Sequence, residues 1–328
     1  MIGSWQQPSL YSSTTKTSSE MDRAWVYLVT GGCGFIGEKI VEVLSQQDYI
    51  KEVRVFGSVA REEVEKFTTG TENVLRACCI LNIPYVVYTS SIAAVGPNTL
   101  HEPMFRANED TKYSGEVELP YGKTKAMAEK LVVEVSGKKV QKSMVAPAVL
   151  QHRMGRREMV RKTPQLISKR VPENTEHNYT YVGNVAWMHV LAARNLQLKP
   201  DLLAEQVCYS YDDTPTRKGF LIRHQLLSSV NPSVRLGSHI PYWKMWLMIQ
   251  LHRIIRVILY PFWKPQPFLN LSLLNTVVTT FSYETDKASR YFGYKPLFTW
   301  KESKHRTAQW LEAAAGNLEQ PQLHEKNS

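Results

Sequence analysis

The chain has 328 residues and a formal net charge of +10, and 43% of its residues are hydrophobic and 21% charged. These values are typical of a globular protein with a full core, built as one large domain or two unequal ones. The positive charge favours an anionic partner, namely a phosphate-bearing cofactor, an acidic membrane surface or nucleic acid. Of these we expect the first two and no nucleic acid.

The cysteines and the N-terminal residues bear on the compartment. Of Cys33, Cys78, Cys79 and Cys208, two are adjacent and one lies in a glycine-rich loop, which argues against a disulfide framework and favours a reducing compartment or a cytosol-facing surface. Residues 1–23 are rich in Ser and Thr and lack the apolar segment of a signal peptide. We expect a disordered leader there.

Apolar strands and amphipathic helices alternate along the first half of the chain. The pattern predicts, in order, a strand at Trp25–Thr30, a helix at Glu38–Ser45, a strand at Val53–Phe56, a helix at Glu62–Leu81, a strand at Tyr85–Ser90, a helix at Tyr121–Val135 and a strand at Ser143–Leu150. This alternation is typical of an α/β protein with a Rossmann-like, doubly wound parallel sheet.

The segment between the second and third predicted strands is short. Only 28 residues separate Phe56 from Tyr85, and they contain one recognisable helix. Each β-α-β crossover takes about 30 residues or more, and a dinucleotide-binding half needs three parallel strands. The sequence therefore predicts a sheet that lacks two strands.

The second half of the chain has weaker patterns. Gln151–Arg170 holds seven Lys or Arg residues and one Glu, and is either a basic loop or a patch that contacts phosphate or membrane. Tyr181–Asn195 is apolar at helical spacing. We expect a truncated dinucleotide-binding domain at 24–150, a smaller substrate and membrane-associated region at 151–315, and a frayed tail at 316–328.

An aromatic and aliphatic segment, Pro241–Trp263, carries cations along its length. No uncharged stretch in it reaches the roughly 20 residues that span a bilayer. One interpretation is a monotopic helix in the membrane interface, anchored by Trp243, Trp246 and Trp263. The other is an amphipathic helix packed on its own domain.

Glycines at Gly31, Gly34 and Gly37 lie between the first strand and the first helix. In such a loop the first glycine permits a tight turn, the second lets a pyrophosphate approach the backbone, and the third lets the helix pack closely. Backbone N–H groups at the helix N-terminus then bind the anion. The candidate cofactor-binding residues are Gly31, Gly34, Phe35, Ile36 and Gly37, and the alternative is a purely structural turn.

Tyr121 and Lys125 are four residues apart and share a helix face. An ammonium beside a phenol favours the phenolate, which allows the tyrosine to exchange a proton with a substrate hydroxyl. Lys125 would also bond the ribose of a nicotinamide cofactor. Such a pair also occurs by chance on helix surfaces, so only its combination with the glycine loop points to hydride transfer.

Two serines, Ser90 and Ser91, end the predicted strand Tyr85–Ser90. This is the carboxyl edge of the sheet, where α/β proteins place ligands. A serine hydroxyl there can hydrogen-bond a substrate oxygen and stabilise charge on it. The alternative is that either hydroxyl caps a helix or turn.

Together these motifs resemble the extended short-chain dehydrogenase/reductase superfamily and, within it, the 3β-hydroxysteroid dehydrogenase family, nearest to its C27-sterol (bile-acid) type. The resemblance extends from about Ala24 to Ala315 with two interruptions. It is densest at Tyr27–Phe35, Thr69–Val74, Tyr88–Ser91, Val95–Thr99, Tyr181–His189 and Phe292–Leu297.

The resemblance implies that Ser91, Tyr121 and Lys125 are the catalytic residues, with Tyr121 as general acid/base. It implies NAD as cofactor, no metal, and a 3β-hydroxy-Δ5-steroid substrate that is oxidised to the 3-oxo steroid, in many members with a shift of the double bond to Δ4. It also implies the cytosolic face of the endoplasmic reticulum membrane. A homo-oligomer is left open.

Two departures from the family accompany the resemblance. Gly57 stands where similar proteins have the acidic residue that holds the adenosine ribose, and the family's following region is missing up to about Glu65. At Val145–His152 only Pro147 of the family's motif persists. Intact sequence on both sides of an abrupt loss indicates exon skipping or a faulty gene model.

Two further interpretations of function stay open from the sequence. The first is a non-catalytic, membrane-associated isoform of such an enzyme, which the short Phe56–Tyr85 span favours. The second is another extended-family epimerase or reductase with the same serine, tyrosine and lysine.

Overall fold

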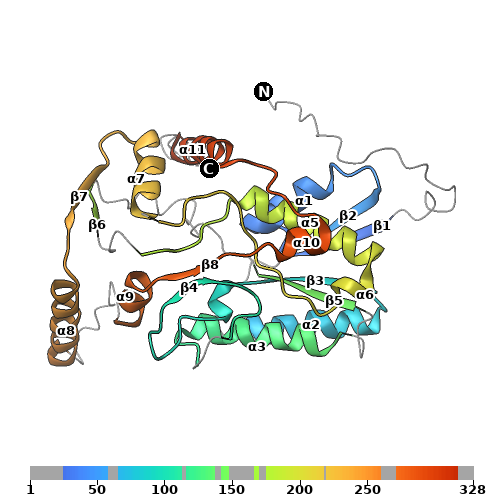
Figure 1. The fold of residues 1–328 in the computed structure, drawn as a ribbon, viewed down its shortest axis with the longest axis horizontal. Helices are drawn as coiled ribbons and strands as arrows, with labels where there is room; N and C mark the ends of the chain where they lie inside the picture. Colours follow the sequence, from blue (N-terminus) through green and yellow to red (C-terminus); the bar gives the residue numbers. More distant parts are fainter. Residues whose placement is uncertain are drawn as a thin grey trace, which may run out of the picture. The chain divides into compact units, whose positions relative to one another are not determined.

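The structure is a computed structural model that describes residues 25–57, 66–112, 116–136, 142–147, 166–169, 175–217, 219–259 and 271–316. The expected leader at 1–23, most of the basic run at 151–170 and all but the first residue of the expected tail lie outside these ranges, as does the predicted boundary at residue 150. The chain forms two compact units, Met1–Val59 and Ala60–Ser328, which are described separately (Figure 1).

The first unit is a single β-α-β element. Strand β1 (Trp25–Thr30) is followed by helix α1 (Phe35–Leu44) and strand β2 (Ile50–Phe56). The strands pair in parallel, with Tyr27 opposite Val53 and Thr30 opposite Phe56. The helix begins three residues before the predicted start because Gly34, in extended conformation, leads directly into it.

The second unit contains a parallel pair formed by β3 (Tyr85–Ser90) and β5 (Lys142–Pro147). Helices α2 (Lys66–Ile80) and α3 (Pro120–Glu134) lie along one side of this pair, and α5 (Val182–Leu198) packs on the other (Figure 1). Coverage on both faces explains why Tyr85–Ser90 is apolar without alternation.

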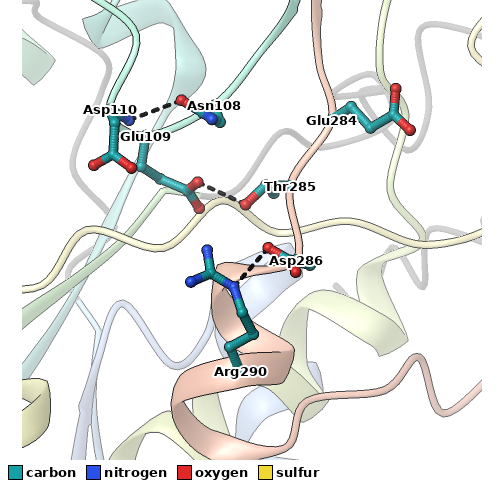
Figure 2. Close-up of a pocket in the computed structure, with 7 residues that line it drawn as sticks. All are labelled: Asn108, Glu109, Asp110, Glu284, Thr285, Asp286 and Arg290. Atoms are coloured by element: carbon teal, nitrogen blue, oxygen red, sulfur yellow. Dashed lines mark hydrogen bonds and ion pairs between the residues drawn. The ribbon is translucent and has the colours of Figure 1, made fainter.

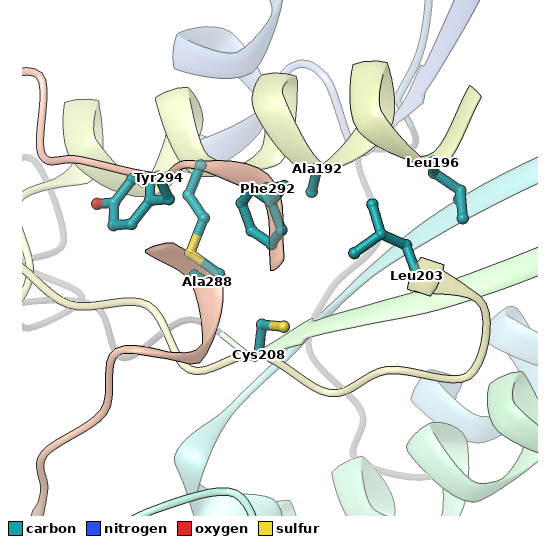
Figure 3. Close-up of a cluster of buried hydrophobic side chains, with 8 residues drawn as sticks. Ala192, Leu196, Leu203, Cys208, Ala288, Phe292 and Tyr294 are labelled. Carbon is teal, nitrogen blue, oxygen red and sulfur yellow. The ribbon is translucent and has the colours of Figure 1, made fainter. Parts of the chain in front are cut away.

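The side chains of β3 nevertheless alternate between the two helix layers. Val86 and Tyr88 pack with Leu75 of α2 and Val132 of α3. On the opposite face, Tyr85 and Val87 pack against a buried cluster centred on α5, which Figure 3 shows. Its members are Met188, Ala192, Leu196, Leu203, Cys208, Ala288, Phe292 and Tyr294. The period of two along a strand therefore decides which layer each residue of β3 meets.

The rest of the second unit adds further elements, of which the sequence analysis predicts only the helix in the segment Pro241–Trp263. They are η1 (Ile92–Ala94), β4 (Met104–Ala107), β6 (Leu166–Lys169), α6 (Pro200–Leu203), α7 (Gly219–Val230), β7 (Arg235–His239), α8 (Tyr242–Leu259), α9 (Leu271–Val278), β8 (Phe281–Tyr283), α10 (Lys287–Phe292) and α11 (Trp300–Gly316). Of the strands, β4 pairs with β8 and β6 with β7, both in parallel. Strands of three to five residues are too short to carry a periodic pattern.

A buried carboxylate ties several of these short segments together. Glu176 is almost fully buried and accepts hydrogen bonds from Arg217 Nε at 2.5 Å and Arg106 Nε at 3.4 Å. Its backbone carbonyl accepts from the Phe281 N–H of β8. Burial by itself raises the pKa of this carboxyl, but the two guanidinium groups outweigh it and the pKa lies below its usual value. The ion pair therefore fixes β4 and β8 around an ionised centre.

All the described strands are parallel, which agrees with the expected α/β, Rossmann-like fold. Within the described ranges they form four two-stranded sheets, β1–β2, β3–β5, β4–β8 and β6–β7, where a doubly wound sheet would run continuously. Between β2 and β3 the structure describes one helix, α2, and no strand. The predicted shortfall of strands in this part of the chain agrees with that arrangement.

Helix α8 corresponds to the aromatic segment Pro241–Trp263, of which Trp263 lies outside the described ranges. Met245 and Ile249 are buried and pack with Leu274 of α9. Most of its other apolar side chains are exposed, among them Trp243, Trp246, Leu247, Met248, Leu251, Ile254, Val257 and Ile258. The helix therefore packs along one narrow stripe and presents a wide apolar face. Among the described residues, no helix has the length and hydropathy that a transmembrane span requires.

Candidate active site

The glycine loop of the first unit is closed by backbone hydrogen bonds. The Gly31 N–H donates to the Phe56 carbonyl at 2.6 Å, and the Gly34 N–H donates to the Gly31 carbonyl at 2.9 Å. Gly31 has a φ of +70°, a conformation that residues with a Cβ rarely adopt. The first glycine therefore makes the tight turn that the sequence predicts.

Gly37 lets the first turn of α1 touch this loop. A Cβ at this position would lie 2.2 Å from the Gly31 oxygen and 2.6 Å from the Gly32 Cα, so a side chain would force the two apart. Helix α1 begins at Gly34 without a side-chain cap. Because the N–H groups of a first helical turn point outward and carry partial positive charge, Gly31, Gly34, Phe35, Ile36 and Gly37 form a backbone cradle that fits a pyrophosphate.

Position 57, where the resemblance leads us to expect a ribose-binding acid, holds a glycine and no carboxylate. A Cβ on Gly57 would lie 2.7 Å from the Cys33 Sγ and 3.0 Å from the Cys33 Cβ. Gly57 therefore packs directly on Cys33 of the glycine loop. The first unit fits the phosphates of a dinucleotide but offers no acidic side chain for ribose at this position.

In the second unit, the two serines at the carboxyl end of β3 have different environments. Ser90 is 3% exposed, and its hydroxyl donates to Glu129 Oε2 of α3 at 2.6 Å. Ser91 is the N-cap of η1, where its Oγ accepts from the Ala93 N–H at 3.2 Å. The capping alternative is therefore present at Ser91, while Ser90 bonds a side chain of the neighbouring helix.

Lys125 reaches the same edge from α3. Its Nζ donates to the Thr89 carbonyl at 3.2 Å and lies 5.3 Å from the centroid of the Tyr88 ring. Burial lowers the pKa of the Lys125 ammonium, and the nearby Glu129 carboxylate opposes this effect. Burial also raises the pKa of the Tyr88 phenol to about 12, which keeps it neutral. Lys125 is thus a partly buried cation fixed to the end of β3.

Tyr121 stands in the first turn of α3, directly after Pro120, and is 42% exposed. The next residue brings this turn against η1. A Cβ on Gly122 would lie 2.2 Å from the Ala93 oxygen and 2.5 Å from the Val117 Cγ1. The segment capped by Ser91 and the turn that carries Tyr121 are therefore packed backbone to backbone. The second unit brings the regions of Ser91, Tyr121 and Lys125 together at one edge, and the glycine loop belongs to the first unit.

The sequence analysis does not identify three residues near this edge, namely Glu129, Thr89 and His189. Glu129 bonds Ser90, and its spacing of four from Lys125 is visible in the sequence. Thr89 Oγ1 lies 2.8 Å from His189 Nε2 of α5, a pairing across 100 residues that no local pattern reveals. Burial lowers the pKa of His189, and its Nδ1 lies 2.8 Å from the Val185 carbonyl. A neutral ring that donates from Nδ1 to this carbonyl accepts the Thr89 hydroxyl at Nε2.

A separate polar cavity of about 300 Å³ lies in the second unit, lined by Asn108, Glu109, Asp110, Glu284, Thr285, Asp286 and Arg290 (Figure 2). Glu109 accepts from the Thr285 hydroxyl at 2.6 Å and the Tyr209 N–H at 2.7 Å. Asp286 pairs with Arg290 at 2.8 Å. None of the predicted site residues lines it, and its charged walls do not suit an apolar substrate.

Solved structures share the fold. The chain superposes on UDP-glucose 4-epimerase from Brucella ovis in complex with NAD with a TM-score of 0.59 at 14% identity, covering 88% of this chain and 99% of that one. A short-chain dehydrogenase/reductase superfamily protein from Agrobacterium tumefaciens with bound NAD gives 0.58 at 13% identity, covering 90% and 99%. The fold is therefore that of the extended short-chain dehydrogenases/reductases, α/β and Rossmann-like.

Sequence comparison is more specific. The model of the 3-beta hydroxysteroid dehydrogenase/isomerase family matches residues 28–69 and 57–236. The 3 beta-hydroxysteroid dehydrogenase type 7 of Mus musculus is 33% identical over 89% of this chain and 97% of its own length, and that of Homo sapiens is 33% identical over 90% and 97%. The chain belongs to the 3-beta hydroxysteroid dehydrogenase/isomerase family, as the sequence motifs predict.

The same comparisons locate the interruption. The two family matches meet and overlap at residues 57–69, where the sequence predicts missing strands. The mouse alignment is 358 positions long, and 89% of 328 residues is about 292, which leaves about 66 positions without a residue of this chain. The chain therefore matches 97% of the length of these relatives, with about 66 alignment positions that have no residue of this chain.

Proposed function

We propose that the chain is an NAD-dependent dehydrogenase that oxidises a 3β-hydroxy-Δ5-steroid to the 3-oxo steroid. The observation that carries this proposal is the gathering of the Ser91, Tyr121 and Lys125 segments at the carboxyl end of β3, in a member of this family. Oxidation removes a proton and a hydride from the alcohol, and bound NAD⁺ supplies the hydride acceptor. The residues of the chain receive the proton and hold the oxygen.

Tyr121 is the proposed general base. Its phenol is accessible to a substrate hydroxyl at the start of α3. Because an unperturbed tyrosine has a pKa near 10, it needs nearby positive charge to act as a base at neutral pH. The Lys125 ammonium, one helical turn further on, supplies that charge and is the proposed ligand of the nicotinamide ribose.

Ser91 is the proposed ligand of the substrate oxygen. Its Oγ uses a lone pair to cap η1, which fixes the side chain and leaves the hydroxyl proton to be donated. A hydrogen bond from this proton would stabilise the charge that develops on the oxygen as Tyr121 withdraws the proton. The capping contact and the catalytic role are therefore compatible.

The cradle in the first unit and the fold support a dinucleotide cofactor. The backbone of Gly31, Gly34, Phe35, Ile36 and Gly37 would hold the pyrophosphate. Similar solved structures are complexes with NAD, which supports NAD. Gly57 removes the usual basis for excluding NADP, so we expect weaker discrimination between the two cofactors than an acidic residue would give.

The relatives support the proposed substrate. Those at about one third identity are named type 7 enzymes, which supports a sterol of the C27 type. A relative from vaccinia virus (strain Copenhagen), 28% identical over 88% of this chain and 99% of its own length, is named a dehydrogenase and Δ5→4-isomerase. Ultraviolet absorption of the product tests whether this chain also moves the double bond, because only the Δ4 isomer is a conjugated ketone.

Replacement of the proposed base tests the activity. Membranes containing the chain are incubated with a 3β-hydroxy-Δ5-sterol and NAD⁺, and NADH is followed by absorbance. We expect Tyr121→Phe to lower the rate by about 100-fold or more, because it removes the group that accepts the proton. Tyr242→Phe is the matched control, since Tyr242 is 44% exposed against 42% for Tyr121 and lies on α8. Equal rates for the two variants would refute the assignment of Tyr121.

We also propose that the exposed face of α8 contacts the cytosolic surface of the endoplasmic reticulum membrane. This helix exposes two tryptophans and a wide apolar face, and carries Lys244, Arg253 and Arg256. Aromatic rings favour the headgroup region, and cations favour anionic lipid. A sterol substrate partitions into the same membrane, so this contact would bring the enzyme to it.

A non-catalytic, membrane-associated isoform is the second candidate, and the missing internal sequence favours it. Titration calorimetry with NAD⁺ separates the two. Binding together with turnover supports the dehydrogenase. The absence of both, in a chain that still binds vesicles and melts cooperatively, supports the isoform.

A further inference from the structure

Glu129 occupies a position that the proposed catalytic residues do not explain. It follows Lys125 by one helical turn and Tyr121 by two, so the three side chains follow one side of α3. It is partly buried, and its carboxylate accepts the short hydrogen bond from the buried Ser90 hydroxyl. A carboxylate turned into a helix–strand contact is unusual and needs a compensating partner.

The groups around Glu129 supply that partner. Lys125 lies one helical turn earlier on the same helix; burial lowers the pKa of Lys125 and raises the pKa of Glu129, and the charge of each opposes the effect on the other. From β3, Ser90 donates its hydrogen bond and the neutral Tyr88 phenol lies nearby. Tyr209 also senses the Glu129 charge, and burial keeps its phenol protonated. Among these groups Lys125 is the cation.

Lys125 and Glu129 are each hydrogen-bonded to β3. Its Nζ donates to the Thr89 carbonyl, and the next residue of β3, Ser90, anchors Glu129. Lysine and glutamate are thus fixed to consecutive residues of one strand. Burial without an opposite charge would favour the neutral amine, which could not stabilise a phenolate.

We propose that Glu129 is a positioning residue of the active site: anchored by the Ser90 hydroxyl one helical turn after Lys125, its carboxylate favours the charged form of Lys125 at the carboxyl end of β3. The role of Lys125 in catalysis rests on the proposed dehydrogenase function. The charge state of Lys125 does not depend on that function and can be measured without turnover.

The test compares Glu129→Gln with the wild type by competitive acetylation. Both proteins, as full chains in detergent, are labelled with acetic anhydride across a pH series, and the peptide with Lys125 is quantified by mass spectrometry. Glutamine keeps an oxygen for the Ser90 hydroxyl but removes the charge. We expect the labelling midpoint of Lys125 to fall by about one pH unit.

Glu134→Gln is the matched control, because Glu134 is exposed at the end of the same helix and pairs with Lys130 at 3.7 Å. It should leave the Lys125 midpoint unchanged. An unchanged midpoint in Glu129→Gln overturns the proposal, whatever the activity. Thermal melting of each variant excludes unfolding as the cause.

Activity adds a second readout. In the dehydrogenase assay, the rate of Glu129→Gln should begin to fall at a lower alkaline pH than the rate of the wild type. The reason is that neutral Lys125 no longer supports the Tyr121 phenolate. A uniform loss at every pH would indicate a merely structural role and contradict the proposal. If the midpoint moves but no variant, wild type included, oxidises the steroid, the inference about Glu129 stands and the proposed function fails.

Discussion

At the scale of single residues, strand alternation separates the two candidate serines. Val86, Tyr88 and Ser90 lie on the α3 side of β3, while Thr89 meets His189 of α5 on the opposite side. Ser91, the first residue after the strand, is the N-cap of η1. The sequence pattern places both hydroxyls at the edge, and the family resemblance points to Ser91. The partner of each serine depends on which helix covers which face, which the sequence pattern does not reveal.

Gly122 offers a residue-scale prediction about the site. We expect Gly122→Ala to destabilise the second unit by about 1–3 kcal/mol and to lower activity, because its Cβ would collide with the Ala93 oxygen and push Tyr121 away from η1. Gly70→Ala in α2 is the control. A Cβ at Gly70 meets nothing within 4 Å, so alanine should stabilise its helix by up to about 1 kcal/mol. Denaturant unfolding measures both, and shifts of the same sign would contradict the packing argument.

At the scale of elements, the sequence predicts several of the longer helices and strands well. The strands at Trp25–Thr30 and Tyr85–Ser90 have the predicted bounds, and α1, α3 and α5 differ by a few residues at their ends. Burial of one face of a helix or strand produces a regular spacing of apolar residues in the sequence. The strand β4 was missed because its pairing with β8 joins residues about 175 apart, a contact that local periodicity does not encode.

The candidate site was predictable to a similar degree. Ser91, Tyr121 and Lys125 were identified by motif and spacing, and the structure places their segments at one edge. Glu129 carried the same spacing but belongs to no motif of hydride transfer. The contact of Gly57 with Cys33 was beyond the sequence, because it depends on how the loop folds back on β2.

Helix α8 supports an element-scale prediction about membrane contact. We expect the double variant Leu251→Ser and Ile258→Ser to bind vesicles of phosphatidylcholine and phosphatidylserine about tenfold or more weakly, since it removes apolar area from the lipid-facing side. Ile80→Ser with Leu198→Ser is the control, because Ile80 and Ile258 are both 70% exposed. Vesicle flotation measures the binding. Equal loss in both double variants would show that general hydrophobicity, not α8, drives the association.

At the scale of the whole molecule, the chain combines clear ancestry with an interrupted sheet. The second unit retains a parallel pair covered by helices on both faces, together with the proposed catalytic edge. The first unit retains the glycine loop on a single β-α-β element. About 66 positions of the mouse alignment have no residue of this chain, and the two family matches overlap at residues 57–69, where these units join in sequence. The segments that carry the proposed site are therefore retained, while the described strands form four two-stranded sheets.

Hydrogen exchange tests this division. We expect backbone amides of β1 and β2 to exchange faster than those of β3, because Leu28 and Phe56 are 61% and 62% exposed whereas the β3 side chains are packed between helix layers. Mass spectrometry of peptides from the two regions gives the comparison. Equal protection of β1 and β3 would contradict it. Saturating NAD⁺ should slow exchange in β1 if the cradle binds it.

The apolar side chains that β1 and β2 leave in solvent also bear on the fate of the chain in a cell. A parallel pair is normally covered on both faces, and uncovered Val26, Leu28, Val55 and Phe56 resemble the surface of an incompletely folded protein. Chaperones and proteases act on such surfaces. The steady-state abundance of this protein would then be set by its rate of turnover, and proteasome inhibition should raise it well above that of a relative with an uninterrupted sheet.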